Sequence, residues 1–206
     1  MAIDDYTVHV VDDEEVVRKS LAFLLAMSGF TVRIHESATG FLAAAPTIRN
    51  SCLITDLRMP DMSGVELLRR LKSADLRIPS IVITGHGDVP MAVEAMKAGA
   101  LDFIEKPFED EQLIEAVKRA AAQLTETPDD LADTLVIQSR LNDLSDRERQ
   151  VLSGVVAGLA NKSIAYDLNI SPRTVEVHRA NVMAKMKAKS LPELVRMALS
   201  IKLDLD

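Results

Sequence analysis

Aromatic residues and cysteine are scarce in this chain, and long apolar runs are missing. Aromatic residues make up 3% of the 206 residues, and tryptophan is absent. The one cysteine, Cys52, has no partner for an internal disulfide, which fits a reducing compartment, and its apolar surroundings favour a small buried core residue. No apolar run approaches the roughly 18 residues that a membrane span requires, and the N-terminus is acidic. The sequence therefore favours a cytoplasmic protein over a membrane or secreted one.

Charge is distributed unevenly along the chain, although the net value is −7. Residues 1–124 carry 13 basic and 19 acidic groups, and residues 125–143 carry one basic and five acidic groups. Residues 144–206 carry ten basic and seven acidic groups, and within residues 171–190 the numbers are five and one. This asymmetry indicates an acidic module joined to a basic one, and the basic module suits a nucleic-acid partner.

The first 124 residues alternate short β-rich runs with stretches of helical spacing. Strands are expected at residues 7–11, 31–35, 51–55, 80–84 and 101–105. Ser63 precedes Glu66 by three residues, which is the spacing of a helix-capping box, and Asp88 can cap the helix that carries Pro90. Five strand–helix repeats predict an α/β fold, a doubly wound parallel sheet with helices on both faces.

The character of the sequence changes after residue 124. Pro128 and an acidic cluster stop the preceding helix, and apolar residues then return at helical spacing. From residue 144 onward the strand signals vanish. A capping box at Ser145 and Glu148 opens a helix, and further helices are expected at about 161–168, 172–187 and 191–202. The predicted organisation is a first domain over 4–124, a partly helical linker over 125–143 and an all-α domain over 144–206.

Five polar residues lie at or just after the ends of predicted strands. They are Asp12, Asp13, Asp56, Thr84 and Lys106. Because the carboxyl ends of parallel strands share one edge of the sheet, these side chains are expected to converge in one pocket. Clustered carboxylates suit Mg²⁺, which accepts a substrate phosphate as a further ligand, and a carboxylate beside the metal can form an aspartyl-phosphate. A single such residue would be interpreted as a solvated loop charge, but five at successive strand ends are not.

Four motifs resemble, in order and spacing, those of the bacterial receiver domain over residues 4–124. They are Val10-Val11-Asp12-Asp13-Glu14, Asp56-Leu57-Arg58-Met59-Pro60-Asp61-Met62-Ser63-Gly64, Ile83-Thr84-Gly85 and Lys106-Pro107-Phe108. The resemblance implies a flavodoxin-like sheet of order 2-1-3-4-5 and a phosphoacceptor, Asp56, that takes phosphate from a partner histidine kinase. It implies Mg²⁺ held by Asp12, Asp13, Asp56 and the Arg58 backbone carbonyl, with Thr84 and Lys106 contacting the phosphoryl group.

The same resemblance implies a conformational switch. Phe103 occupies the family's aromatic switch position and would act together with Thr84, and a cis peptide bond is expected at Lys106–Pro107. Phosphorylation would reshape one face of the domain, where Val89, Met91, Val93 and Phe103 would form a homodimer surface. Each of these apolar residues is explained equally well as core. Beyond phosphotransfer to its own aspartate and loss of that phosphate, no enzyme activity is expected.

A basic amphipathic helix is predicted after Ser171 and Pro172, a strong helix start. Small and polar residues on its exposed side suit the major groove, where Asn reads adenine, Glu accepts from cytosine and Val meets a thymine methyl. Lysines on the module suit phosphate contacts. The candidate DNA contacts are Lys162, Ser163, Arg173, Thr174, Glu176, Val177, Ala180, Asn181 and Lys185.

Residues 140–204 resemble the LuxR-type helix-turn-helix. The motifs are Leu144-Ser145-Asp146-Arg147-Glu148, Asn161-Lys162-Ser163-Ile164-Ala165 and Ser171-Pro172-Arg173-Thr174-Val175. The resemblance implies four helices, with the helix-turn-helix spanning Asn161 to Ala180 and 172–187 as the recognition helix. Together the two halves resemble response regulators of the NarL/FixJ class. Residues 82–100 and 161–192 resemble the members that activate nitrogen-fixation genes, which implies promoter DNA and RNA polymerase as partners.

Three alternatives compete with this interpretation. Haloacid-dehalogenase-type phosphatases also use an aspartate nucleophile, but their acidic pair comes last and a second Asp follows the nucleophile, whereas Asp56 is followed by Leu57 and Arg58. A LuxR-type sensor of small molecules would need an apolar ligand pocket rather than charged strand ends. A constitutive DNA-binding protein with a vestigial receiver stays open, although the complete set of pocket residues argues against it.

Overall fold

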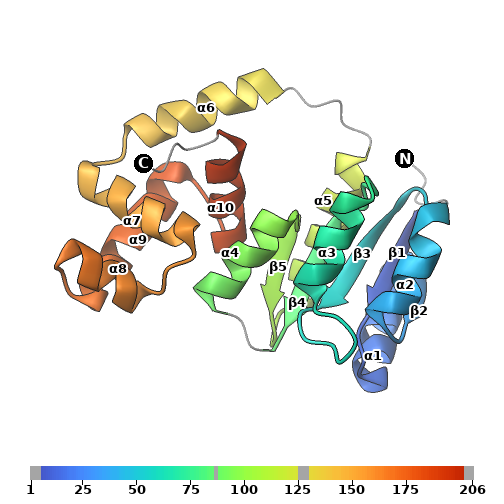
Figure 1. Ribbon diagram of the computed structural model, residues 1–206. Coiled ribbons are helices and arrows are strands. Elements are labelled where there is room, and N and C mark those ends of the chain that lie inside the picture. Colours follow the sequence, from blue (N-terminus) through green and yellow to red (C-terminus); the bar gives the residue numbers. More distant parts are fainter. Residues whose placement is uncertain (1–5, 86–87, 125–129, 202–206) are drawn as a thin grey trace. The chain divides into compact units, whose positions relative to one another are not determined.

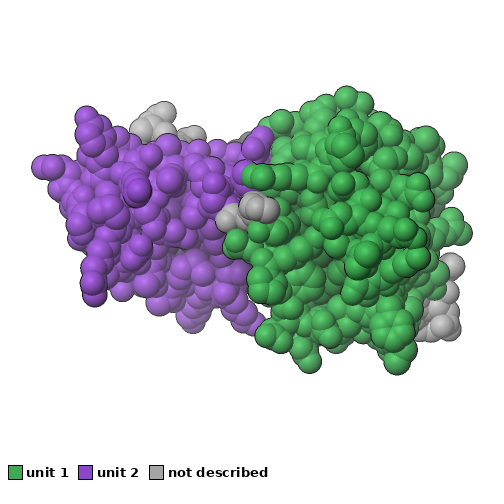
Figure 2. Space-filling model, turned by 90° about the horizontal axis from the view of Figure 1, so that it is seen from below, with its two compact units in different colours: residues 1–86, 98–126 green, residues 87–97, 127–206 purple. Residues whose placement is uncertain are grey.

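The computed structural model describes residues 6–85, 88–124 and 130–201, the last range with side chains from residue 134. The chain divides into two compact units, residues 1–86 with 98–126 and residues 87–97 with 127–206 (Figure 2). This division groups most of helix α4 (Val89–Ala98) with the second unit, although the sequence placed that helix in the first domain. The predicted domain boundaries therefore stay a prediction.

A five-stranded parallel sheet forms the centre of the first unit (Figure 1). Its strands are β1 (Thr7–Val11), β2 (Thr31–His35), β3 (Ser51–Asp56), β4 (Ser80–Thr84) and β5 (Asp102–Glu105). The order β2-β1-β3-β4-β5 confirms the expected flavodoxin-like arrangement. All five residues of β4 are buried, and its centre, Ile81 to Ile83, is apolar because helices cover both faces of the strand.

Helices cover both faces of this sheet. On one face, α1 (Glu15–Met27) and α5 (Asp110–Gln123) enclose a core that includes Val8 and Val10 of β1. On the other face, α2 (Ala38–Ala44) and α3 (Gly64–Ser73) pack over Val11, Phe41, Leu53, Leu67 and Leu71, and the short 3₁₀ turn η1 (Ala45–Thr47) follows α2. The register pairs Val11 with Thr55, so Asp12 and Asp56 leave the sheet side by side. Strand pairing alone thus brings the first two acidic residues together.

The C-terminal part of the chain, residues 130–201, consists of helices joined by short turns. Its helices are α6 (Asp130–Asn142), α7 (Asp146–Ala157), α8 (Asn161–Leu168), α9 (Pro172–Met186) and α10 (Leu191–Ser200). One core joins α6, α7, α9 and α10 around Leu141, Leu152, Val182, Met186 and Leu194. A second joins α7, α8 and α9 around Val151, Val155, Ile164 and Val175. No helix among the described residues is long and apolar enough to cross a membrane.

Local signals set the ends of these helices. Ser145 and Glu148 form both bonds of the predicted capping box, and the Ser171 hydroxyl accepts from the Thr174 N–H. Helix α9 ends one residue before the predicted position, because Lys187 takes a left-handed conformation with φ of 55°. Helix α10 ends at Ser200 rather than at 202, and residue 202 lies outside the described residues.

Candidate functional site

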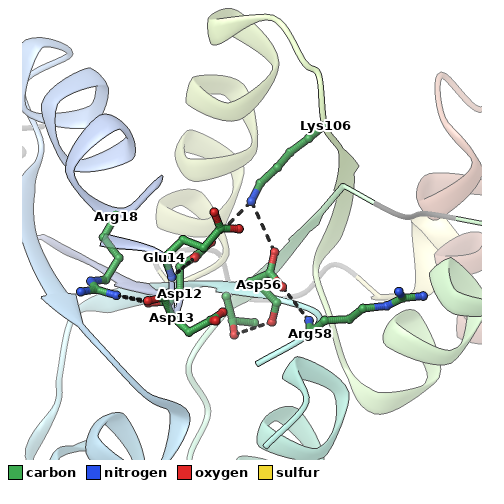
Figure 3. A network of polar contacts seen from close by, with 8 residues as sticks. Asp12, Asp13, Glu14, Arg18, Asp56, Arg58 and Lys106 are labelled. Carbon is green, nitrogen blue, oxygen red and sulfur yellow. Dashed lines mark hydrogen bonds and ion pairs between the residues drawn. The ribbon is translucent and has the colours of Figure 1, made fainter. Parts of the chain in front are cut away.

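Three of the predicted pocket residues meet at the carboxyl edge of the sheet (Figure 3). Lys106, which follows β5, places its Nζ atom 3.4 Å from Asp12 Oδ2 and 3.4 Å from Asp56 Oδ1. Asp12 is 3% exposed, whereas Asp56 is half-buried. One ammonium group is therefore shared between two carboxylates that come from neighbouring strands.

Backbone N–H groups orient both carboxylates. The Glu14 N–H donates to Asp12 Oδ1 at 2.9 Å, and the Arg58 N–H donates to Asp56 Oδ2 at 2.6 Å. Each carboxylate thus has one oxygen held by its own loop and the other turned toward Lys106. Burial raises the pKa of Asp12, with the Glu14 N–H and the Lys106 ammonium acting in the opposite direction. Because Lys106 faces both Asp12 and Asp56, two carboxylates share one cation and the cluster is short of positive charge.

The residues of this pocket fit a magnesium ion. Carboxylate and carbonyl oxygens are its preferred ligands, and Asp13, which follows Asp12 in the chain, adds an exposed carboxylate. Within the described parts of the chain, no three acidic, histidine or cysteine side chains gather tightly enough to enclose a metal ion. Mg²⁺ tolerates such an open site because it keeps several water ligands.

The predicted switch residues lie on adjacent strands. Thr84 ends β4 and is buried, and its carbonyl accepts from the Lys106 N–H at 2.8 Å. Phe103 on β5 is buried opposite Val82. The expected cis bond at Lys106–Pro107 is confirmed.

The predicted dimer residues differ in exposure. Val93 is buried, whereas Val89 and Met91 are half-buried. Among the predicted surface residues of α4, Val89 and Met91 therefore offer more area to a partner than Val93 does in this conformation.

Sequence reasoning missed Arg18, which lies in the first half of α1. Its guanidinium Nη1 donates to the carbonyl oxygens of Asp12 at 2.6 Å and Asp13 at 2.9 Å (Figure 3). Arg18 shares the buried face of its helix with Leu21 and Leu25, three and seven residues later. A charged residue at that spacing on an otherwise apolar face was the signal that could have revealed it.

The exposed surface of α9 matches the prediction from the sequence. Val175, Val182 and Met186 are buried on its inner face. The predicted DNA-contacting residues on its outer face are exposed, as are those of α8: Lys162, Ser163, Arg173, Glu176, Val177, Ala180 and Asn181. Thr174 is half-buried, and its hydroxyl lies 2.8 Å from Ser171 Oγ, so it also helps to begin the helix.

Lys185 is placed differently from the other candidate DNA contacts. Its Nζ donates to Glu148 Oε2 at 2.7 Å and to the Asp143 carbonyl at 3.1 Å. The Lys185 hydrogen bond is the largest cause of a lowered pKa at the buried Glu148. The ammonium of Lys185 therefore joins α9 to the start of α7.

Tyr166, four residues after Lys162 on α8, is 87% exposed and is not among the DNA contacts predicted from the sequence.

Comparisons with known proteins agree with this arrangement. Residues 8–118 match the response regulator receiver domain, and residues 142–198 match the bacterial regulatory proteins of the luxR family. The chain is 73% identical to the transcriptional regulatory protein FixJ of Rhizobium meliloti (strain 1021), over 95% of this chain and 96% of that protein. It is 50% identical to FixJ of Bradyrhizobium diazoefficiens, over 93% of this chain and 94% of that protein.

Solved structures give the same result. The crystal structure of full-length FixJ from B. japonicum is 49% identical, with a TM-score of 0.57, over 95% of this chain and 96% of that chain. These matches decide against the phosphatase and against a small-molecule sensor in the N-terminal half. The chain belongs to the FixJ-like response regulators, transcription regulators in which phosphorylation of a receiver domain controls a LuxR-type DNA-binding domain.

Proposed function

We propose that Asp56 Oδ1 is the atom that accepts the phosphoryl group from a phosphohistidine of a partner kinase. The observation that carries this proposal is the orientation of the Asp56 carboxylate, with Oδ2 held by the Arg58 N–H and Oδ1 facing Lys106. The phosphorus–nitrogen bond of the donor breaks as the bond from phosphorus to Oδ1 forms. Lys106 then pairs with the phosphoryl oxygens, and the Thr84 hydroxyl donates to another of them.

The same proposal includes a metal. Asp12, Asp13, Asp56 and the Arg58 carbonyl would hold Mg²⁺, which when bound neutralises charge on the carboxylates and the phosphoryl group. Asp12 is deeply buried and shares a single lysine with Asp56, which supports a further positive charge at this site.

Phosphorylation would be read out through Thr84 and Phe103. Movement of these residues would favour a homodimer formed through the face that carries Val89, Met91, Val93 and Phe103, and it would release the basic module from restraint by the acidic receiver. The dimer binds promoter DNA in the cytoplasm, contacts RNA polymerase and activates nitrogen-fixation genes. Similarity to proteins named FixJ supports this choice of target.

The exposed side of α9 would read base edges in the major groove. Glu176, Val177, Ala180 and Asn181 would contact bases, and Arg173 and Lys162 would contact phosphates. The exposure of these side chains supports the assignment. Lys185 is left out of this set because its ammonium is bonded to Glu148 and Asp143.

Selection of genomic DNA fragments by the full-length protein tests both the switch and the targets. The wild type, Asp56→Asn and the control Asp75→Asn, an exposed carboxylate elsewhere on the domain, are incubated with acetyl phosphate and Mg²⁺. Wild type and Asp75→Asn should enrich one set of promoter fragments, and Asp56→Asn should not. If Asp56→Asn recovers the same fragments equally well, the receiver is vestigial and the proposal is wrong.

A further inference from the structure

Arg18 is a buried cation without a buried carboxylate partner. Its side chain is 7% exposed, and the acidic group nearest its Nη2 is Glu36 Oε1, at 4.0 Å and on a side chain that is 88% exposed. Its Nε is buried and has no hydrogen-bond partner among the described residues. An ion pair with so exposed a carboxylate contributes little. The guanidinium is therefore stabilised chiefly by the two carbonyl oxygens that it contacts.

Those two carbonyls belong to consecutive residues of the loop that carries the acidic pair. Nη1 bridges the oxygens of Asp12 and Asp13, at 2.6 and 2.9 Å (Figure 3). A guanidinium is planar, always charged and rich in donors, so it fixes two acceptors in a defined geometry. Fixing both peptide groups fixes the direction in which the Asp12 and Asp13 side chains leave the backbone.

An apolar residue would serve this position better if packing were its only purpose. Arg18 shares the inner face of α1 with Leu21 and Leu25, and burying a charge there is costly. The charged guanidinium instead holds the loop that carries Asp12 and Asp13. Among the contacts of Arg18, the bonds to Asp12 and Asp13 are the shortest.

We infer that Arg18 is a positioning residue of the phosphorylation pocket. By holding the carbonyls of Asp12 and Asp13 on the side away from the pocket, it keeps both carboxylates ready for Mg²⁺ before any phosphate arrives. This inference rests on the magnesium site proposed above. Loss of a residue that holds the metal ligands, without contacting the metal itself, typically lowers metal affinity by about 10- to 100-fold.

Calorimetric titration of Mg²⁺ into the unphosphorylated full-length protein tests the inference. Arg18→Met keeps the alkyl stem but removes every donor, and it should raise the Kd for Mg²⁺ at least about 10-fold. Arg18→Lys keeps a donor within the same space and should recover part of that loss. The control Lys19→Met removes an exposed cation one residue later, paired with Glu15 on the same helix, and should leave the Kd unchanged.

Thermal unfolding in the presence of a chelator separates this role from a purely structural one. If Arg18→Met lowers the melting temperature but binds Mg²⁺ as tightly as the wild type, Arg18 only stabilises the fold and the inference is overturned. If Arg18→Met does not fold, Arg18→Leu, which matches Leu21 and Leu25 on the same helix face, provides the same comparison without a donor, and a wild-type Kd in that variant overturns the inference. If the wild type itself does not bind Mg²⁺, the metal proposal fails as well, so the two failures are distinguishable.

Discussion

In two regions of this protein a lysine contacts buried carboxylate groups. The two regions differ in whether the positive and negative charges balance. In the helical region, Lys185 donates to Glu148 at 2.7 Å, and the Ser145 N–H also donates to Glu148, at 2.8 Å. At the sheet edge, Lys106 lies 3.4 Å from each of two carboxylates. In the helical region one lysine neutralises one glutamate. At the sheet edge one lysine is shared between two aspartates. A completed pair indicates structure, and a cluster short of charge indicates a binding site.

The largest effect is expected where the charge is incomplete. Lys106→Met removes the cation that would pair with the phosphoryl oxygens and should slow phosphorylation of Asp56 by a small phosphodonor about 100-fold. Because the Lys106 side chain is 26% exposed and its contacts with the carboxylates are long, the free energy of unfolding should change by less than about 1 kcal/mol. Quantitative mass spectrometry of the aspartyl-phosphate and chemical denaturation measure the two. A large loss of stability with an unchanged rate would make Lys106 a structural residue.

A histidine pair within the sheet offers a further completed polar contact. His9 Nδ1 lies 2.9 Å from His35 Nε2, and the two rings stack with centroids 5.1 Å apart. Burial, with His35 and Arg33 adding to it, lowers the pKa of His9 from 6.5 to about 4. As the pH falls, His9 therefore becomes protonated near pH 6.5 in the unfolded chain but only near pH 4 in the folded chain.

Stability should consequently fall as the pH drops from 6.5 toward 4. The loss contributed by His9 is on the order of 2 kcal/mol between about pH 8 and pH 5. Urea unfolding of the full chain, followed by circular dichroism at both pH values, measures it. His9→Gln should flatten the dependence, and an equally steep dependence in that variant would assign the effect to other groups.

Much of the fold could be predicted because local signals agree with the tertiary environment. The central strands β3 and β4 are apolar runs since both faces are covered, and their predicted bounds differ from the observed ones by at most one residue. Ser145 begins α7 as the capping box predicts, since its bonds are local. The strand-end rule likewise brought Asp12, Asp56 and Lys106 together without knowledge of any distance.

The parts that escaped prediction depend on distances across the chain. Lys185 lies 37 residues from Glu148, and no local pattern indicates that its ammonium is already engaged. The spacing of Arg18 with Leu21 and Leu25 indicates the inner face of its helix, but it does not indicate that the guanidinium contacts two backbone carbonyls. The exposure of Tyr166, 87%, likewise depends on how its helix packs, and no local pattern indicates it.

A smaller effect is expected from breaking the completed pair. Lys185→Met leaves the buried Glu148 carboxylate without its charged partner and should lower the free energy of unfolding of the C-terminal helices by about 1–2 kcal/mol. The lysine is 40% exposed, which keeps the loss below that of a fully buried pair. Hydrogen exchange of the α7 and α9 amides in the full chain locates the change. The rate of Asp56 phosphorylation serves as the control and should stay the same.

The smallest expected effect is a difference between Lys162 and Lys185 in the salt dependence of DNA binding. Lys162 is exposed on α8, where a phosphate can reach it, whereas Lys185 is bonded within the domain. In the phosphorylated full chain, Lys162→Met should therefore reduce the slope of log binding constant against log salt concentration by about 1 on a mixed-sequence duplex, because one fewer counterion is released. Lys185→Met should leave the slope unchanged. Since both variants remove one positive charge, a difference between them reports contact rather than net charge, and a reduced slope in Lys185→Met alone would show that the Glu148 pair opens to release its lysine to DNA.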